Sequence, residues 1–347
     1  MTPEDSLRLG VLMAGDVQAI RIDEAAMVVH GLTSKGEVAV RLHPAGRPDQ
    51  YLRKVREFLA GFAVGSPGGY PVHLRRWTRM GQARSEGIEK LLLFGEPEAV
   101  VSVAYSAALT DELARRVWWI MPDSANARRM LERECVVKGS MGRVLVDHLV
   151  EFLPFENEPY VIIDTVKLVL KSGLADDEMR KKLWKKGKYD NAYYVGFLAA
   201  LPDDLPEQDP PRAEFGEMMQ DGEDACCRQL SRTLSGPGQT FLRVAAEVLD
   251  RPADRDVVIY TLDALAAYFS PVAGTKPEGR ENFTAEWEAM TRLAAMDSRI
   301  AHHVLSRTTA VGTLLRQKLD PVLSEVFSTI ATLRGKPLIS GSRRRRS

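Results

Sequence analysis

The N-terminal residues show first the pattern of a helix and then that of strands. Thr2, Pro3 and Asp5 predict a helix start, because a hydroxyl caps the first turn, proline suits the first helical position and an acid follows. Three short runs rich in β-branched residues predict an antiparallel sheet: 19–23, 27–30 and 37–42. Apolar residues three and four apart predict a helix over 49–63 that covers this sheet. We therefore expect a small α+β domain over residues 1–64.

Helical periodicity dominates the next part of the chain. Residues 72–201 predict a helical array, in which glycine and proline mark the turns between successive helices. Two segments, 109–118 and 176–184, both run from an acid-rich first turn to two bases, an aliphatic residue and a tryptophan. This similarity is either a true repeat or chance agreement between two amphipathic helices. A true repeat would stack helical pairs in the manner of an α-solenoid.

A change of composition separates this array from the C-terminal part. Residues 202–225 contain four prolines and many acids, and they predict an acidic, proline-rich linker. A helical bundle is predicted over 226–335, where apolar residues between 300 and 333 repeat every eleven residues, as in one long helix that Pro321 breaks. Residues 336–347 predict a disordered basic tail with four arginines. The expected fold class is mainly α, with a small N-terminal α+β cap, a helical array and a C-terminal helical bundle.

Composition and charge exclude several classes of protein. The 347 residues are 45% hydrophobic and 27% charged, which excludes intrinsic disorder and collagen. Because 47 basic and 47 acidic residues balance, binding of a polyanion or an acidic membrane would depend on a local patch. No stretch reaches the ~20 apolar residues of a membrane helix. Three cysteines without disulfide or CxxC spacing, and a start unlike a signal peptide, predict a soluble cytoplasmic protein.

The spacing of reactive residues predicts no catalytic or cofactor site. Residues 65–69 are rich in glycine but lack the lysine of a phosphate-binding loop. His148 and Glu151 lie three residues apart on a predicted helix, but their order is wrong for a di-iron site, and we interpret His148 as a surface histidine. Cys226 and Cys227 are interpreted as ordinary thiols, although a thiol-based role in sulfur handling stays open. We expect no enzymatic activity, no cofactor and no metal.

Basic clusters that surround a tryptophan form the candidate interaction patch. Lysine and arginine beside an aromatic ring favour single-stranded RNA, because cations pair with phosphates and bases stack on the ring. On helices, such clusters are more often solvated faces. The candidate residues are Arg75, Arg76, Trp77, Arg79, Lys181, Lys182, Trp184, Lys185 and Lys186.

Several strings in the first two hundred residues resemble one known family. They are GSPGGYPV at 65–72, LRRWTRMGQ at 74–82, LLFGEPEAV at 92–100, NARRMLE at 126–132 and VGFLAALPDDLP at 195–206. These strings are similar to the sulfur reduction protein S family, cytoplasmic accessory proteins of the dissimilatory sulfite reductase gene cluster in sulfur-oxidising bacteria. The resemblance implies a non-enzymatic accessory or regulatory protein that contacts proteins of the sulfur oxidation pathway. RNA-binding regulation is the alternative function, and sulfur handling through Cys226 or Cys227 is the second alternative.

Overall fold

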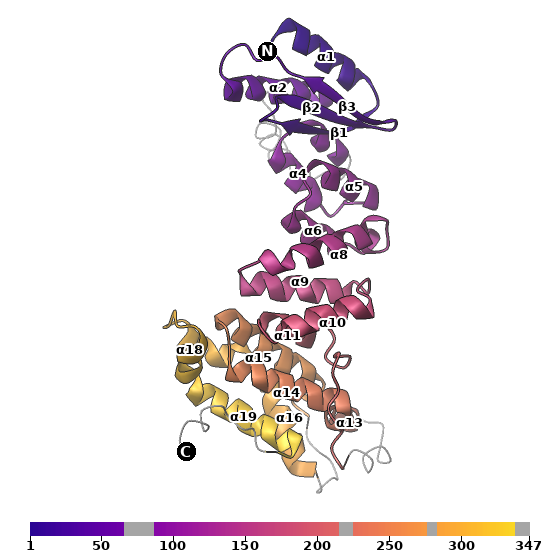
Figure 1. Ribbon diagram of the computed structural model, residues 1–347. Coiled ribbons are helices and arrows are strands. Elements are labelled where there is room, and N and C mark those ends of the chain that lie inside the picture. The colour runs from indigo at the N-terminus through magenta and orange to yellow at the C-terminus, as the bar shows by residue number, and fades with distance from the viewer. Residues whose placement is uncertain (66–86, 215–224, 276–282, 337–347) are drawn as a thin grey trace. The chain divides into compact units, whose positions relative to one another are not determined.

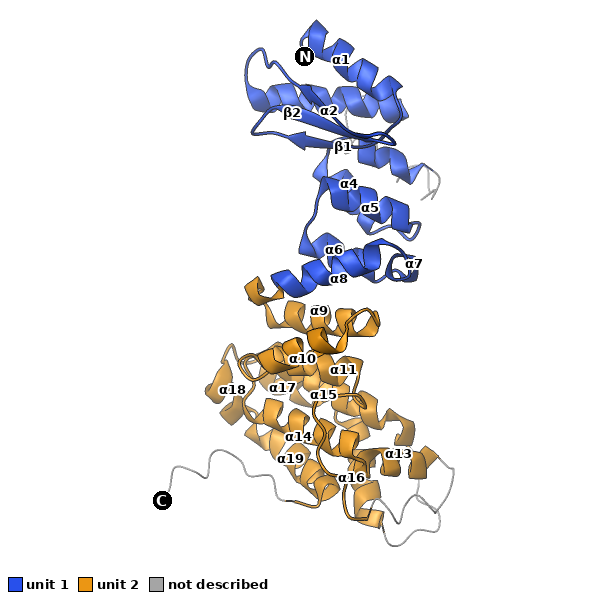
Figure 2. Ribbon diagram, turned by 45° about the vertical axis from the view of Figure 1, so that its right-hand side comes forward, with its two compact units in different colours: residues 1–152 blue, residues 153–347 orange. Residues whose placement is uncertain are grey.

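The computed structural model describes residues 1–65, 87–214, 225–275 and 283–336. These residues are mainly helical, with a three-stranded antiparallel sheet near the N-terminus (Figure 1), which confirms the predicted fold class. The chain divides into two compact units, residues 1–152 and 153–347 (Figure 2).

Unit 1 begins with the predicted α+β fold. Helix α1 (Pro3–Ala14) is capped by the Thr2 side chain, which accepts the Asp5 N–H. The sheet follows in the order β1 (Val17–Asp23), β2 (Val28–Thr33) and β3 (Gly36–Arg41), and then comes α2 (Pro48–Val64). Apolar residues of α1 and α2 pack on Ile20 and Val29 of the sheet and form one core: Leu9, Leu12, Leu52, Val55 and Leu59. As predicted, α2 covers the sheet.

A buried carboxylate connects three parts of this core. Asp5 is fully buried, and its Oδ2 accepts the His43 backbone N–H at 2.7 Å and the Tyr51 hydroxyl. Burial raises the pKa of Asp5, but the hydrogen bonds from His43, Tyr51 and Thr2 outweigh it, so the pKa of Asp5 lies below its ordinary value. The charged carboxylate therefore holds α1, α2 and the segment after β3 together.

Short helices complete unit 1. They are η1 (Ile88–Leu93), α4 (Pro97–Ala104), α5 (Asp111–Ile120), α6 (Ser124–Leu131), α7 (Glu134–Val137) and α8 (Met141–Phe152). The N-terminus of α8 is capped from a distance, because the Asp111 carboxylate accepts the backbone N–H groups of Ser140 and Met141 at 2.8 and 3.0 Å. Gly139 allows this approach, since a Cβ there would lie 2.2 Å from the Asp111 side chain.

Unit 2 contains the remaining helices. They are η2 (Leu153–Phe155), α9 (Pro159–Lys171), α10 (Asp177–Lys186), α11 (Ala192–Ala200), α13 (Ala225–Leu234), α14 (Gly236–Asp250), α15 (Arg255–Phe269), η3 (Ser270–Val272), α16 (Thr284–Ala295), η5 (Ser298–Ala301), α17 (His302–Leu305), α18 (Gly312–Lys318) and α19 (Asp320–Arg334). Helix α11 lies at the centre and packs against α9, α10, α14 and α15. Gly196 allows the close approach of α9, because a Cβ there would lie 2.6 Å from Val166 Cβ.

The acidic segment predicted as a linker lies inside unit 2, and its described part packs against helices. Leu205 is buried. The Asp209 N–H donates to the Thr240 hydroxyl at 2.7 Å, and the Arg212 N–H donates to the Leu234 carbonyl at 3.0 Å. Residues 202–214 therefore form a fixed strap along α13 and α14.

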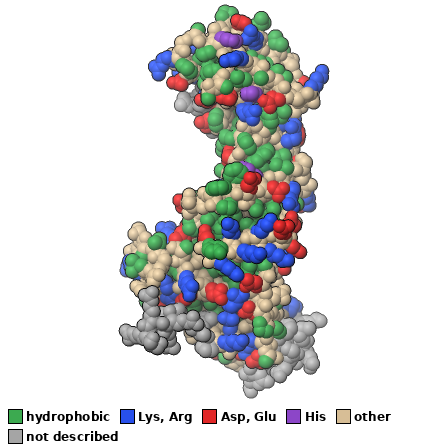
Figure 3. All heavy atoms as spheres, in the orientation of Figure 1, with side chains coloured by type: hydrophobic (Ala, Val, Ile, Leu, Met, Phe, Trp, Pro, Cys, Tyr) green, Lys and Arg blue, Asp and Glu red, His purple; other side chains and the backbone are tan. Residues whose placement is uncertain are grey.

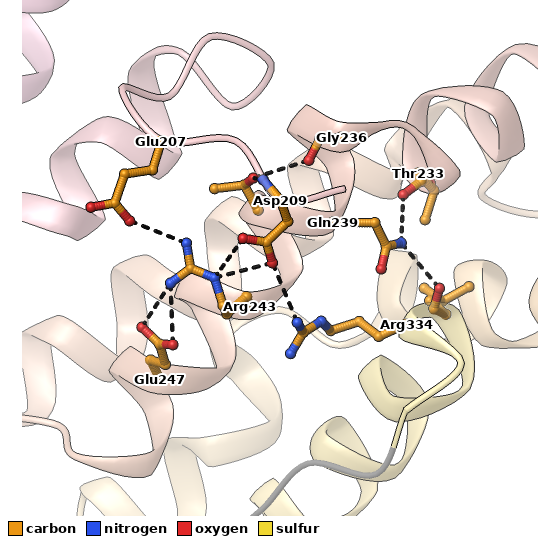
Figure 4. Close-up of polar contacts among 10 residues, drawn as sticks. Glu207, Asp209, Thr233, Gly236, Gln239, Arg243, Glu247 and Arg334 are labelled. Atoms are coloured by element: carbon orange, nitrogen blue, oxygen red, sulfur yellow. Dashed lines mark hydrogen bonds and ion pairs between the residues drawn. The ribbon is translucent and has the colours of Figure 1, made fainter. Parts of the chain in front are cut away.

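Charged side chains fasten this strap (Figure 4). The Asp209 carboxylate lies between Arg243 of α14, at 3.0 Å, and Arg334 of α19, at 3.4 Å. Arg243 also pairs with Glu207 of the strap and with Glu247 on its own helix, at 3.3 and 3.2 Å. The acids of this segment, which indicated a solvated linker in the sequence, are thus partly used to hold it against unit 2.

The long helix predicted over 300–333 is wrong in its first half. The structure has η5, α17, α18 and α19 there, and residues 306–311 are not helical. Gly312 begins α18 with a left-handed φ of 57°, which a continuous helix does not allow. The break at Leu319 is confirmed: Pro321 lies in the first turn of α19, where its missing N–H costs no hydrogen bond.

The two similar sequence segments form α5 and α10, which begin in the same way. Thr110 and Asp176 are the N-caps, and each side chain accepts a backbone N–H of the first turn. The Asn–Ala pairs that follow are placed differently, because Asn126 lies within α6 and Asn191 precedes α11. The helical arrangement is consistent with a repeat, and the correspondence is limited to the first helix of each pair.

Candidate interaction surface

Helix α10 carries the basic residues that the sequence indicated. Two of its apolar side chains are buried, and its lysines are exposed. Leu183 and Trp184 are buried, whereas Lys181, Lys185 and Lys186 are exposed. Figure 3 shows Lys and Arg side chains gathered over this part of unit 2. The helix is therefore amphipathic, and beyond its acidic first turn its solvent-facing side is mainly basic.

Trp184 belongs to the core and not to the exposed patch. Its exposed fraction is 3%, and its ring centroid lies 4.6 Å from that of Tyr194 and 5.1 Å from that of Phe197. The indole Nε1 has no hydrogen-bond partner among the described residues. The ring is not available to stack on a base, so the expectation of an exposed tryptophan among the lysines was wrong.

The basic side chains of this region divide into paired and unpaired groups. Arg180 pairs with Asp204 at 2.7 Å, and Lys182 pairs with Glu178 at 2.8 Å. Four more lysines are exposed and form no ion pair within the described parts of the chain: Lys181, Lys185, Lys186 and Lys188. Because no carboxylate of the described residues pairs with them, their charges are available to an anionic partner.

Two residues that the sequence did not indicate extend this region. Tyr189 follows the last lysine and is 91% exposed. The Asn191 side-chain N–H donates to the Arg251 carbonyl at 2.7 Å, which brings the turn between α14 and α15 beside the turn between α10 and α11. Arg251 is exposed and has no ion pair with a described residue. We call Lys181, Lys185, Lys186, Lys188, Tyr189 and Arg251 the α10 surface.

The other members of the predicted patch lie outside the described residues. They are Arg75, Arg76, Trp77 and Arg79, and the same holds for the arginines at 343–346.

His148 lies among aromatic rings on α8. Its ring centroid is 4.7 Å from Trp118 and 4.3 Å from Phe152, and its Nε2 is 3.2 Å from the Ser124 hydroxyl. Burial lowers the pKa of His148, although the charges of Glu151 and Asp123 oppose the shift. Within the described residues, no group of three or more His, Cys, Asp or Glu side chains could hold a metal ion. The histidine is a packing residue here.

The three cysteines differ in exposure. Cys135 is exposed, Cys226 is half-buried and Cys227 is buried. Cys226 and Cys227 lie in the first turn of α13. Burial limits the access of a reagent to Cys227.

No known protein family, curated protein or solved structure matches this chain. The helices of the described ranges include none that is long and apolar enough to cross a membrane.

Proposed function

We propose that this protein is a non-enzymatic accessory protein that binds another protein through the α10 surface. The observation that carries the proposal is the set of four exposed lysines, Lys181, Lys185, Lys186 and Lys188, without ion pairs in the described chain. Elsewhere on the protein, bases are commonly neutralised by acids three or four residues away, as Arg143 is by Asp147 at 2.9 Å. Unpaired lysines on one helix and the turn that follows it raise the local positive potential in a chain of zero net charge.

The resemblance to the sulfur reduction protein S family supplies the biological setting of the proposal. It supports a partner from the cytoplasmic sulfur oxidation pathway that uses dissimilatory sulfite reductase. The compartment and the pathway both depend on this resemblance, whereas the binding surface depends on α10. The two parts of the proposal can therefore fail separately.

Affinity purification tests the proposal. The tagged full chain is expressed in cells that grow by oxidising reduced sulfur, and the proteins that co-purify at low salt are identified by mass spectrometry. We expect sulfur-pathway proteins, and we expect their loss when Lys181, Lys185, Lys186 and Lys188 are all changed to Gln. A control with the same change of charge replaces four exposed lysines elsewhere: Lys35, Lys54, Lys90 and Lys318.

Retention by the control variant and loss by the α10 variant support the proposal. Recovery of no sulfur-pathway protein, or equal recovery by both variants, contradicts it. RNA binding, the alternative function, is tested in the same material by treating the eluate with ribonuclease. If the co-purifying proteins depend on RNA, the α10 surface binds RNA and the proposed protein contact is wrong.

A further inference from the structure

We infer that the α10 surface docks the acidic face of a helix in the partner protein, with Tyr189 as the apolar anchor of the contact. This inference rests on the proposed function and names the chemistry of the partner at the same site.

Spacing favours a partner helix. Lys181, Lys185 and Lys188 are separated by four and three residues, which places them along one side of α10 and the turn that continues it. At 1.5 Å per residue, this row is about 10 Å long. Carboxylates at positions i, i+4 and i+7 of a second helix have the same spacing and length, so such a helix could pair with all three lysines.

Acidic residues at the N-terminal end of the row disfavour a long polyanion. Asp177 and Glu178 are 86% and 79% exposed at the start of α10, and Asp204 is 65% exposed beside Arg180. A nucleic-acid strand that continued past this end of the row would bring its phosphates towards these carboxylates, and like charges repel. The acidic face of a short partner helix would end before it reached these carboxylates. The limited length of the basic row thus favours a protein partner.

The aromatic content of the surface leads to the same conclusion. Sequence-independent binding of single strands uses several aromatic rings, on which successive bases stack. Trp184 is buried, which leaves Tyr189 as the single large aromatic side chain of the α10 surface. One exposed tyrosine next to a row of lysines is instead typical of a protein interface, where its ring enters an apolar pocket and its hydroxyl stays at the rim.

Arg251 completes the surface from a second helix connection. The hydrogen bond from Asn191 to the Arg251 carbonyl fixes the two turns relative to each other. Because the guanidinium donates in a planar fork, Arg251 can bind one carboxylate with two hydrogen bonds, which a lysine cannot do. Tyr189 and Arg251 therefore lie at one end of the lysine row, where they would orient the partner helix.

The test measures binding of a designed peptide by the purified full chain. The probe is a fluorescent helical peptide with Glu at i, i+4 and i+7 and a leucine on the same face; the control peptide has the same composition with the acids spread around the helix. Binding is followed by fluorescence anisotropy at low salt. We expect the first peptide to bind at least about fivefold more tightly than the control peptide, because only it can pair with the three lysines at once.

Single variants then test the named residues. We expect Tyr189→Ala to weaken binding about tenfold or more, and Lys185→Gln and Arg251→Gln to weaken it about two- to fivefold. The matched controls are Tyr160→Ala, at an exposed tyrosine on α9, and Arg292→Gln, at an exposed arginine paired with Glu288 on α16; both should bind like the parent. Circular dichroism confirms that each variant is folded.

Three outcomes would overturn the inference. They are equal binding of the two peptides, unchanged binding by Arg251→Gln and Tyr189→Ala, and tighter binding of an oligouridylate with the same number of charges. Peptide binding that depends on the α10 surface, together with no sulfur-pathway protein from cells, would contradict the proposed pathway and support the surface chemistry. The failures of the two proposals are thus distinguishable.

Discussion

Trp184, which the sequence predicted as part of a binding patch, is a residue of the core. The ring packs between Tyr194 and Phe197, so Trp184→Ala should lower the free energy of unfolding of unit 2 by about 3–5 kcal/mol. Trp184→Phe also removes the buried indole N–H that lacks a partner in the described residues, which offsets the loss of volume. We expect it to stay within about 1 kcal/mol of the parent. Urea unfolding measures the free energy of unfolding of both variants. Equal losses of stability in Trp184→Ala and Trp184→Phe would contradict the role of the ring in the core.

Asp5 should make the stability of unit 1 dependent on acid pH. Its pKa in the folded protein is lowered from the ordinary value of 3.8, so the charged form stabilises the fold above that pH. This contribution is lost as the pH falls below 3.8 through the lowered pKa. Asp5→Asn should cost about 1.5–3 kcal/mol at pH 7, because a charged acceptor is removed. The difference between the urea midpoints at pH 7 and pH 3 should then be smaller in Asp5→Asn than in the parent protein. An unchanged difference would contradict the stabilising role of the charged Asp5 carboxylate.

The order of thiol reactivity follows exposure. With N-ethylmaleimide at neutral pH, we expect Cys135 to react first, Cys226 more slowly and Cys227 last, because a buried thiol must wait for local opening. Peptide mass spectrometry over time gives the order. The alternative of sulfur handling predicts the opposite, a thiolate at Cys226 or Cys227 that reacts faster than Cys135 and takes up one sulfur atom from a donor. Faster reaction of Cys226 or Cys227, or uptake of a sulfur atom by either, would support the sulfur-handling alternative.

At the scale of single elements, the sequence predicts best where local signals determine the structure. Thr2 and Pro3 place the start of α1 correctly, since capping involves only neighbouring residues. The break between α17 and α18 was missed, because apolar residues keep a helical spacing through 306–311 while the backbone there is held by long-range contacts, such as Gly312 N–H to the Ala253 carbonyl. The apolar pattern does not show that the helix is continuous, and Val311, which belongs to the pattern, is 63% exposed.

The contact between α9 and α11 depends on the missing side chain of Gly196. Gly196→Ala should lower the free energy of unfolding by about 1–3 kcal/mol, because the new Cβ would lie 2.6 Å from Val166 Cβ and 3.1 Å from the Ile163 carbonyl. Gly10→Ala is the matched control in α1: no heavy atom lies within 4 Å of the new Cβ, and a gain of about 0.5–1 kcal/mol is expected. Thermal unfolding should show opposite signs for the two changes.

At the scale of the whole molecule, the sequence could indicate only part of the candidate surface. The lysines of α10 lie close together in the sequence, so the sequence alone indicates a basic cluster. The burial of Trp184 could also have been predicted, since Leu183 and Trp184 are the main apolar residues of an otherwise charged helix. Arg251 lies sixty residues from Asn191, and only the fold brings the two together. The strap was misinterpreted for the same reason, because its acids pair with arginines that are distant in the sequence.

Arg212 should control the stability of unit 2 as a whole, because it joins three distant parts of it. Its guanidinium pairs with Glu214 and Glu286 at 2.7 and 3.1 Å, and it donates to the Thr332 and Leu333 carbonyls at the end of α19. Burial opposes the charge, but these carboxylates raise the pKa of Arg212. Arg212→Ala leaves Glu286, which is only 14% exposed, without this partner, and should cost about 3–5 kcal/mol.

Thermal unfolding and hydrogen exchange test the role of Arg212. We expect a lower unfolding temperature and faster exchange in residues 202–214 and in the last turn of α19, because one side chain holds both. Arg292→Ala, whose ion pair with Glu288 is exposed, is the control and should change stability by less than about 1 kcal/mol. Faster exchange confined to residue 212 and its neighbours would mean that the strap is held by Asp209 and Leu205 alone, and that Arg212 does not couple it to α19.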